Sequence, residues 1–373
     1  MAKVIVIGAG PAGIMAAIHA SKKHNVILLD GNDRIGKKLF ITGKGRCNVT
    51  NAKDISEFFD YIPGNPHFLY SALYSYTNED TINFFENAGI KLKTERGGRI
   101  FPMSDKSSDI IKGLSIGLKE ANVQVKLNSK VTNIIYNNDK ITGVEINNTT
   151  KLNGDHFILA TGGASYPLTG SRGEGQKFAK SLGHTIIDLK PSLVPIELNE
   201  PWLKELMGLS LKNISLSILK NNKVVYKNQG EMMFTNYGMS GPLVLSGSRY
   251  VKNDGNYEVS LDLKPALNES ELDKRLQKDF LKYQNKEFKN SLDDLLPQKM
   301  IPLIIKLSNI PENKKVNVIT KEERKNLVYL LKNLKAKIKG LRPIEEAIVT
   351  AGGVNTLEID PSTMKSKIIS NLS

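Results

Sequence analysis

Cysteine, tryptophan and long apolar runs are scarce in this chain of 373 residues. The single cysteine, Cys47, excludes an intramolecular disulfide framework, and no Cys/His cluster has the spacing of a metal site. The apolar stretch from Val4 to Ala20 is interrupted by three glycines and a proline, which is untypical of a signal peptide. No other run approaches the roughly 20 apolar residues of a transmembrane helix. We therefore expect a soluble, cytoplasmic protein that binds no metal and no membrane.

Blocks of like charge are also absent, although the net charge is +14. The 52 lysine and arginine residues are spread along the whole chain, which favours a solvated basic surface. Such an excess leaves room for a polyanionic partner such as RNA. Because no Arg-rich tract or aromatic-basic nucleic-acid motif accompanies the charge, a nucleic-acid partner is disfavoured but not excluded.

The chain begins with a short apolar strand, Val4 to Ile7, that runs into Gly8-Ala9-Gly10-Pro11-Ala12-Gly13 and a helix. In such a βαβ unit the first glycine permits a tight turn, the second lets the backbone approach a pyrophosphate, and the third lets the helix pack on the strand. Asp30 ends the next strand 17 residues later, where it can accept hydrogen bonds from a ribose hydroxyl. The pattern predicts a dinucleotide site, and the alternative is a purely structural glycine turn.

A later segment favours FAD over NAD as the dinucleotide. The residues from His156 to Ala160 form a compact apolar strand, and Thr161-Gly162-Gly163 follow it. This segment resembles the Ala-Thr-Gly segment of two-dinucleotide flavoproteins, in which the chain returns beside the cofactor. The alternative is an ordinary buried strand that ends in a glycine turn.

Further motifs resemble the HI0933-like flavoproteins, also labelled BaiN-like or aminoacetone-oxidase-like, which are regarded as NAD(P)/FAD-dependent oxidoreductases. The matching segments are residues 36–39, 42–51, 98–106, 161–167, 234–242 and 349–354. The resemblance covers nearly the whole chain. It implies an α/β fold: a Rossmann-like FAD-binding domain of the two-dinucleotide flavoprotein type, with an inserted antiparallel β domain and a helical segment. It also implies a flavin redox centre, a small-molecule substrate and NAD(P)H as a candidate transient electron donor.

Hydrophobic periodicity gives the expected domain boundaries. Alternation at Ile214, Leu216 and Ile218 indicates half-buried antiparallel strands, whereas Leu327, Leu330, Leu334 and Ile338 form a helical stripe that we expect to end at Gly340. Short strands at 123–127, 131–136 and 141–146 suggest a small antiparallel meander. We expect the first part of the FAD-binding domain at 1–190, an inserted β domain at 191–268, its helical part at 269–341, and an incomplete return to the FAD-binding domain at 342–373.

A glycine-rich loop at 43–51 is expected to border the flavin ring. Arg46 would balance phosphate or flavin charge, and the Asn48 amide would bond the isoalloxazine edge; the alternative is a turn tied by Asn side chains. Cys47 beside Arg46 invites a thiolate role, but a lone cysteine cannot form a CxxC disulfide, so we expect it to pack near the flavin without redox cycling. No catalytic residue is assigned. The predicted cofactor-binding residues are Gly8, Gly10, Pro11, Ala12, Gly13, Asp30, Gly31, Lys38, Gly43, Gly45, Arg46, Cys47, Asn48, Val131, Thr161, Gly162, Gly163, Gly352 and Gly353.

The resemblance also implies a further strand, a Gly-Glu segment, a Gly-Gly turn and a final helix beyond Ser373. We therefore expect a C-terminally truncated form with weakened FAD retention and an exposed apolar patch on the first domain; the alternative is a native end that has been remodelled. The predicted function is that of an FAD-dependent oxidoreductase, which reduces an activated C=C bond with NAD(P)H or oxidises a small organic substrate. The alternatives are a flavin-bearing RNA-modifying or RNA-binding protein and an inactive truncated flavoprotein.

Overall fold

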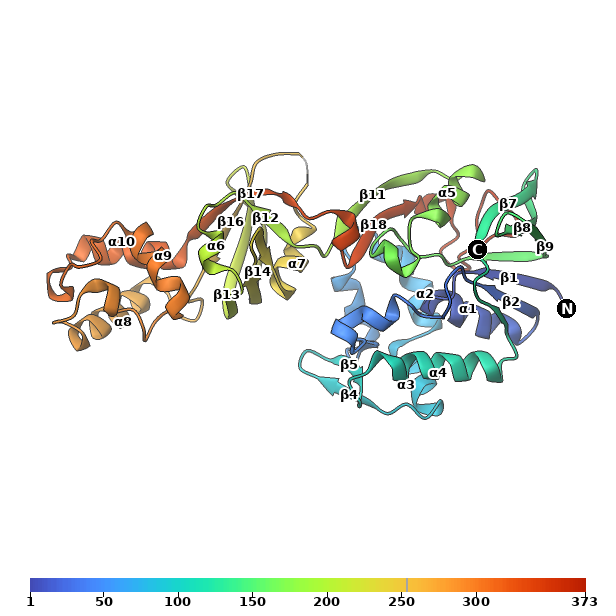
Figure 1. Ribbon diagram of the computed structural model, residues 1–373, viewed down its shortest axis with the longest axis horizontal. Helices are drawn as coiled ribbons and strands as arrows, with labels where there is room; N and C mark the ends of the chain where they lie inside the picture. Colours follow the sequence, from blue (N-terminus) through green and yellow to red (C-terminus); the bar gives the residue numbers. More distant parts are fainter. Residues whose placement is uncertain (253) are drawn as a thin grey trace. The chain divides into compact units, whose positions relative to one another are not determined.

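The computed structural model describes residues 1–252 and 254–373 and divides the chain into two compact units (Figure 1). Unit 1 contains Met1–Leu189 and Ala351–Ser373, and unit 2 contains Lys190–Thr350. The FAD-binding type of domain is therefore built from both ends of the chain, with the intervening residues forming a separate core. Among the described residues, no helix has the length and apolar character needed to cross a membrane.

A parallel four-stranded sheet forms the centre of unit 1, with strands in the order β10-β1-β2-β6. Its strands are β1 (Lys3–Ile7), β2 (Asn25–Leu29), β6 (Gln124–Lys126) and β10 (His156–Leu159). β1 and β2 are nearly continuous runs of buried apolar residues, as expected for parallel strands covered on both faces. Because parallel strands share one carboxyl edge, β1, β2 and β10 all end where the glycine loop begins.

Two layers cover this sheet. Helices α1 (Pro11–Ser21) and α4 (Ser107–Glu120) form one apolar cluster with residues of the sheet. An antiparallel meander forms a second apolar cluster with the sheet. The meander consists of β7 (Val131–Asn137), β8 (Lys140–Ile146) and β9 (Thr150–Asn153).

The placement of the segment at 123–127 in that meander was wrong. This segment contains β6, which pairs in parallel with β2 and extends the main sheet. A short apolar strand has the same periodicity in either sheet, so only the pairing partner distinguishes the two positions.

The remaining elements lie wholly or partly in unit 1. Helix α3 (Asn78–Asn87) begins with a capping box between Thr77 and Asp80. The other helices are α2 (Tyr70–Ser75) and α5 (Glu174–Ser181), with 3₁₀ turns at Leu39–Gly45, Ile55–Tyr61 and Pro66–Leu69. The other strands are β3 (Thr50–Asn51), β4 (Leu92–Glu95), β5 (Arg99–Pro102) and the pair β11 (Ile186–Ser192) and β18 (Val349–Val354).

Unit 2 is a closed antiparallel barrel joined to a group of helices. The barrel strands are β12 (Ile196–Leu198), β13 (Ser210–Lys220), β14 (Lys223–Phe234), β15 (Gly238–Ser240), β16 (Tyr257–Asp262) and β17 (Leu334–Leu341). The helices are α6 (Leu203–Leu206), α7 (Pro242–Ser248), α8 (Glu269–Lys282), α9 (Ile301–Ser308) and α10 (Lys321–Lys332). The alternation at Ile214, Leu216 and Ile218 lies on β13, whose apolar side chains fill the barrel.

The predicted extension of the last helix to Gly340 was wrong. Helix α10 begins with a capping box between Thr320 and Glu323 but ends at Lys332, and the next residues form β17. The apolar residues of this stretch satisfy helical spacing, but Leu334 and Ala336 also alternate with exposed lysines at strand spacing. Pairing of Ala336 with Val259 of β16 closes the barrel and decides in favour of the strand.

The last residues of the chain lie along β10. The Phe157 amide donates to the Asn371 carbonyl at 2.9 Å, and the Ser373 amide donates back to the Phe157 carbonyl at 2.9 Å. Leu372 is buried there. The expectation of an exposed apolar patch on the first domain therefore does not hold at this edge of the sheet.

A buried hydrogen-bonded group fastens this C-terminal segment. His184 is 4% exposed; its Nδ1 lies 3.1 Å from Glu358 Oε2 and its Nε2 lies 2.8 Å from Ser366 Oγ. Ser366 Oγ also accepts from the backbone amides of Ile368 and Ile369. The arrangement has the order of a Ser-His-acid triad, but the serine oxygen is committed to two backbone donors, so we interpret it as structural.

Ser366→Ala should destabilise unit 1 by about 1–3 kcal/mol, because it leaves buried donors and His184 without their partner. Urea unfolding measures the effect, and Ser362→Ala, at an exposed serine of the same segment, is the matched control. Equal midpoints for the two variants would contradict the structural role.

Candidate functional site

The glycine loop lies at the carboxyl edge of the parallel sheet, between β1 and α1. Gly8 has φ +108°, and a Cβ there would lie 2.4 Å from the Ala160 carbonyl oxygen. A Cβ on Gly13 would lie 1.9 Å from the Gly8 oxygen. By contrast, a Cβ on Gly10 would have no neighbour within 4 Å. Two glycines are therefore required by packing, and the third keeps an open approach to the N-terminus of α1.

Asp30 follows β2 and ties the loops of the site together. One carboxylate oxygen accepts from the Ala9 amide at 2.6 Å, and the other accepts from the Asn32 amide at 2.8 Å and its side chain at 2.9 Å. Oδ1 accepts both bonds from Asn32, whereas Oδ2 accepts only the bond from Ala9, so Oδ2 keeps a lone pair for a ribose hydroxyl. The hydrogen bond from Asp30 to a ribose hydroxyl stays a prediction. The structure adds a second role for Asp30, which is to hold the backbone at Ala9 and Asn32.

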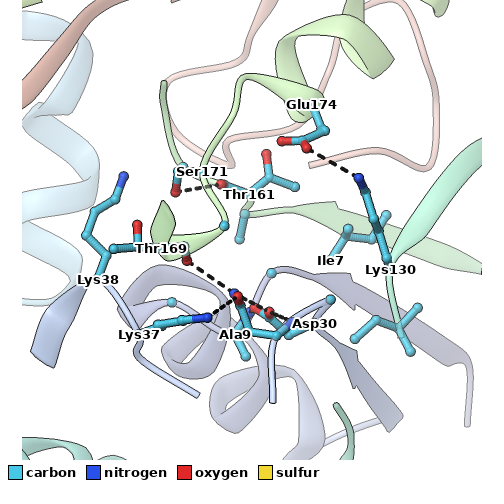
Figure 2. Close-up of a pocket in the computed structure, with 18 of the residues that line it drawn as sticks. Ile7, Ala9, Asp30, Lys37, Lys38, Lys130, Thr161, Thr169, Ser171 and Glu174 are labelled. Atoms are coloured by element: carbon cyan, nitrogen blue, oxygen red, sulfur yellow. Dashed lines mark hydrogen bonds and ion pairs between the residues drawn. The ribbon is translucent and has the colours of Figure 1, made fainter. Parts of the chain in front are cut away.

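A cavity of about 480 Å³ opens over this loop (Figure 2). It brings together these predicted residues: Gly8, Gly10, Pro11, Ala12, Asp30, Gly31, Lys38, Val131, Thr161 and Gly162. It also has lining residues that the sequence reasoning missed: Asn32, Lys37, Ser129, Lys130, Thr169, Ser171, Arg172 and Glu174. Two sequence signals were available for part of the missed group: the motif at 36–39, which contains Lys37, and the polar, glycine-rich stretch at 169–175.

Positive side chains outnumber negative ones around the cavity. Lys37, Lys38, Lys130 and Arg172 line it, against Asp30 and Glu174. Lys130 Nζ lies 3.7 Å from Glu174 Oε1 across the opening (Figure 2). Burial lowers the pKa of the Lys38 ammonium group, because desolvation disfavours its charge. An anion beside Lys38 would raise the pKa of its ammonium group again. The excess of basic over acidic side chains around the cavity also suits a diphosphate.

The loop at 42–48 has an unusual backbone. Gly43, Lys44, Gly45 and Cys47 have φ values between +56° and +83°. Lys44 and Cys47 adopt this left-handed conformation without being glycine, which is uncommon and indicates that the surrounding contacts fix the loop. None of these residues lines the nucleotide cavity, so their contact with the flavin ring stays a prediction.

Arg46 is held by protein carboxylates. It donates to Asp105 Oδ1 at 2.6 and 2.8 Å and to Glu95, and its guanidinium lies 4.2 Å from the centre of the Phe101 ring. These hydrogen bonds raise the pKa of Arg46, and those from Lys93 and Arg46 lower the pKa of Asp105. Asp105 and Glu95 already balance the charge of Arg46, so we interpret its role as fixing the loop. Its predicted role against phosphate or flavin charge stays a prediction.

Cys47 and Asn48 line a second, apolar cavity of about 130 Å³. Pro11 lines both cavities, so the small cavity adjoins the start of α1. The Asn48 amide nitrogen, in its bonded orientation, donates to the carbonyl oxygens of Ile100 and Thr50. These bonds are those of a turn tied by an Asn side chain, which was the alternative to a flavin contact.

The other predicted residues lie beside the cavity or away from it. Gly163 accepts from the Gly173 amide at 3.3 Å and does not line the cavity. Gly352 and Gly353 belong to β18, and a Cβ on Gly352 would lie 2.2 Å from the Asp188 oxygen of β11. Close strand packing accounts for Gly352, and contact of either glycine with a flavin stays a prediction.

The comparisons with known proteins agree with this geometry. The family model described as the HI0933-like protein Rossmann domain matches residues 2–373. The chain belongs to the HI0933-like family. It is an FAD-dependent oxidoreductase of this family, and the lined cavity fits the nucleotide half of FAD in its open glycine, helix N-terminus and charge.

Curated relatives match over almost the full chain. A 3-dehydro-bile acid delta(4,6)-reductase of Clostridium scindens is 30% identical over 382 residues, covering 100% of this chain and 91% of that protein. Ribosomal RNA dihydrouridine synthases of Escherichia coli and Haemophilus influenzae are 30% and 32% identical, covering 99% of this chain and 89% and 90% of theirs. The structure of a 3-ketosteroid-delta4-(5alpha)-dehydrogenase from Rhodococcus jostii is similar at 12% identity and a TM-score of 0.45, covering 100% of this chain and 89% of that chain.

Gly10→Ala should weaken FAD binding by about tenfold or more, about 1.4 kcal/mol, without weakening the fold. The added methyl group has room within the protein but occupies the approach that a pyrophosphate needs. Titration with FAD measures the affinity, and urea unfolding without FAD measures the fold. The control is Gly340→Ala, whose Cβ also has no neighbour within 4 Å but which lies in unit 2. Unchanged FAD affinity in Gly10→Ala would contradict this site.

Cys47 is 1% exposed, and burial raises the pKa of its thiol, so the protonated form dominates at neutral pH. We expect iodoacetamide to alkylate the folded protein roughly tenfold or more slowly than the urea-unfolded chain. We also expect Cys47→Ser to keep its flavin absorbance and turnover. Loss of all turnover with FAD still bound would show that the thiol takes part in the reaction.

Proposed function

We propose that this protein reduces a carbon–carbon double bond that is conjugated to a carbonyl group, with NAD(P)H as the reductant. The observation that carries the proposal is the chemistry shared by relatives with different substrates. A delta(4,6)-reductase is named for reduction of ring double bonds, and dihydrouridine is uridine whose C5=C6 bond has been reduced. Both substrates present a double bond in conjugation with a carbonyl group, so the bond type rather than the molecule is what the relatives share.

The described residues support the binding half of this reaction. Gly8, Gly10 and Gly13 give the backbone its close approach, and Lys37 and Lys38 supply positive charge at the same cavity. Bound FAD supplies two-electron transfer between donor and acceptor. In the balanced reaction NAD(P)H becomes NAD(P)⁺, and the double bond gains the electron pair and two hydrogens, one of them as a proton from solvent.

The proposed flavin-ring surroundings include the loop at 42–48 and the apolar cavity beside it. Arg46 and its carboxylate partners hold the loop. The predicted cofactor contacts of Gly43, Gly45, Cys47 and Asn48 belong to this proposal. Those of Gly163, Gly352 and Gly353 belong to it as well.

A second candidate is a uridine base within RNA as the substrate. The net charge of +14 favours it, because a polyanion gains from a basic surface whatever its sequence. Uracil carries a C5=C6 double bond conjugated to its C4 carbonyl, so the same reduction applies. The two candidates differ in the molecule that is recognised and agree in the bond that is reduced.

A reduction and reoxidation experiment tests the proposal. Under anaerobic conditions, NADH or NADPH should bleach the absorbance of FAD-loaded protein, and a cyclic enone or a uridine oligonucleotide should restore it. The saturated analogue of the enone is the matched control acceptor, and we expect it to leave the absorbance bleached. Mass spectrometry should find a product two hydrogens heavier than the accepted substrate.

Reoxidation by oxygen but by neither unsaturated acceptor would contradict the reductase proposal. Failure of the purified protein to take up added FAD would instead favour a protein without flavin activity. Reoxidation by the oligonucleotide but not by the enone would decide for the second candidate.

A further inference from the structure

Aromatic rings gather on an exposed segment of unit 1, residues 54–77, in which no residue is buried. Tyr61, Tyr70 and Tyr74 are 68%, 55% and 44% exposed. Phe59, half-exposed, lies among them. We call these four residues the aromatic patch. Large rings at such exposure leave apolar surface in water, which is a common property of binding surfaces.

Three rings of the aromatic patch contact one another. Phe59 lies 5.5 Å from Tyr70 at an interplanar angle of 27° and 6.0 Å from Tyr74 at 17°, so it stacks on both. Tyr70 and Tyr74, on one turn of α2, lie 4.7 Å apart with their rings tilted by 42°. Because Phe59 comes from the 3₁₀ turn at Ile55–Tyr61, two segments combine to hold the stack, and a further flat ring can extend it.

Lys53 fixes the fourth ring of the patch. Its Nζ donates to Tyr61 Oη at 2.8 Å, lies 4.6 Å from the centre of the Tyr61 ring, and pairs with Glu57 at 2.8 Å. These contacts orient Tyr61 while its ring stays the most exposed of the three tyrosines. The patch therefore presents rigid aromatic surface with polar hydroxyl groups.

The aromatic patch is linked along the chain to the proposed flavin-ring surroundings. Tyr76 directly follows α2 and lines the apolar cavity that Cys47 and Pro11 also line. Lys53 comes only five residues after Asn48. The segment that carries the patch therefore ends in a residue, Tyr76, that lines the same cavity as Cys47 and Asn48.

We propose that the aromatic patch stacks an unpaired nucleobase next to the target uridine of an RNA substrate. The inference rests on the second candidate function. Enzymes that act on a base take it out of its stack, and the neighbouring bases then need new stacking partners. Exposed aromatic rings supply them, since every base has a π face. A saturated ring system has no π face to match these rings. The chain's net charge of +14 suits a polyanion, but residues 54–77 carry Asp54, Glu57 and Asp60 and no lysine or arginine, so basic side chains outside this segment would hold the phosphates.

Binding of a fluorescently labelled oligouridylate to FAD-loaded protein, followed by anisotropy at several salt concentrations, tests the inference. The double variant Tyr70→Ala/Tyr74→Ala should bind about 5- to 150-fold more weakly, the loss expected for one stacked base. The slope of log affinity against log salt should stay that of the unaltered protein, because no phosphate contact is removed. Tyr70→Phe/Tyr74→Phe should retain the affinity, because it keeps both rings.

Tyr329→Ala is the matched control, since Tyr329 is 59% exposed on α10 of unit 2, and it should bind as the unaltered protein does. FAD titration and urea unfolding verify that each variant is folded. RNA binding that is unaffected by loss of the two rings overturns the inference and leaves the second candidate standing. Absence of RNA binding by the unaltered protein overturns both. Loss of self-association or of enone binding in the alanine variant, with RNA affinity unchanged, assigns the patch to another partner and overturns the inference.

Discussion

The cofactor site depends on the close packing of α1 against the end of β1. A methyl group on Gly13 would lie 1.9 Å from the Gly8 oxygen, so the helix can start where it does only because neither residue has a side chain. This contact directs the N-terminus of α1 toward the cavity, and Asp30 bonds the Ala9 amide and so fixes the loop between them. Packing thereby prepares an anion site before any ligand binds.

The distribution of paired and unpaired charge decides where an anion can bind in unit 1. Arg46 is an obvious cation in the sequence, but Asp105 and Glu95 neutralise it, so it acts as a brace for its loop. Around the nucleotide cavity, by contrast, basic side chains exceed acidic ones. A basic side chain is therefore structural at Arg46, whereas the excess of basic side chains around the cavity is available to a ligand.

The proposed reduction of one bond type in different substrates is physically reasonable for this architecture. The glycine loop and the cavity proposed to hold the cofactor lie at the parallel sheet and its first helix. Features that could recognise different substrates, such as the rings at Phe59 and Tyr70, lie on exposed segments outside the sheet. Exposed loops on a rigid scaffold can change without disturbing the core that holds the cofactor.

The sequence alone determined the βαβ start and the dinucleotide type of site, because these depend on local signals: glycine spacing and apolar periodicity. It also placed Gly8, Gly10, Asp30, Thr161 and Gly162 at one cavity. Only the tertiary structure decided that 124–126 joins the main sheet, that 334–341 closes the barrel and that Arg46 is neutralised. Each of these depends on a partner far away in the chain, and neither periodicity nor residue type specifies which distant strand or carboxylate that partner will be.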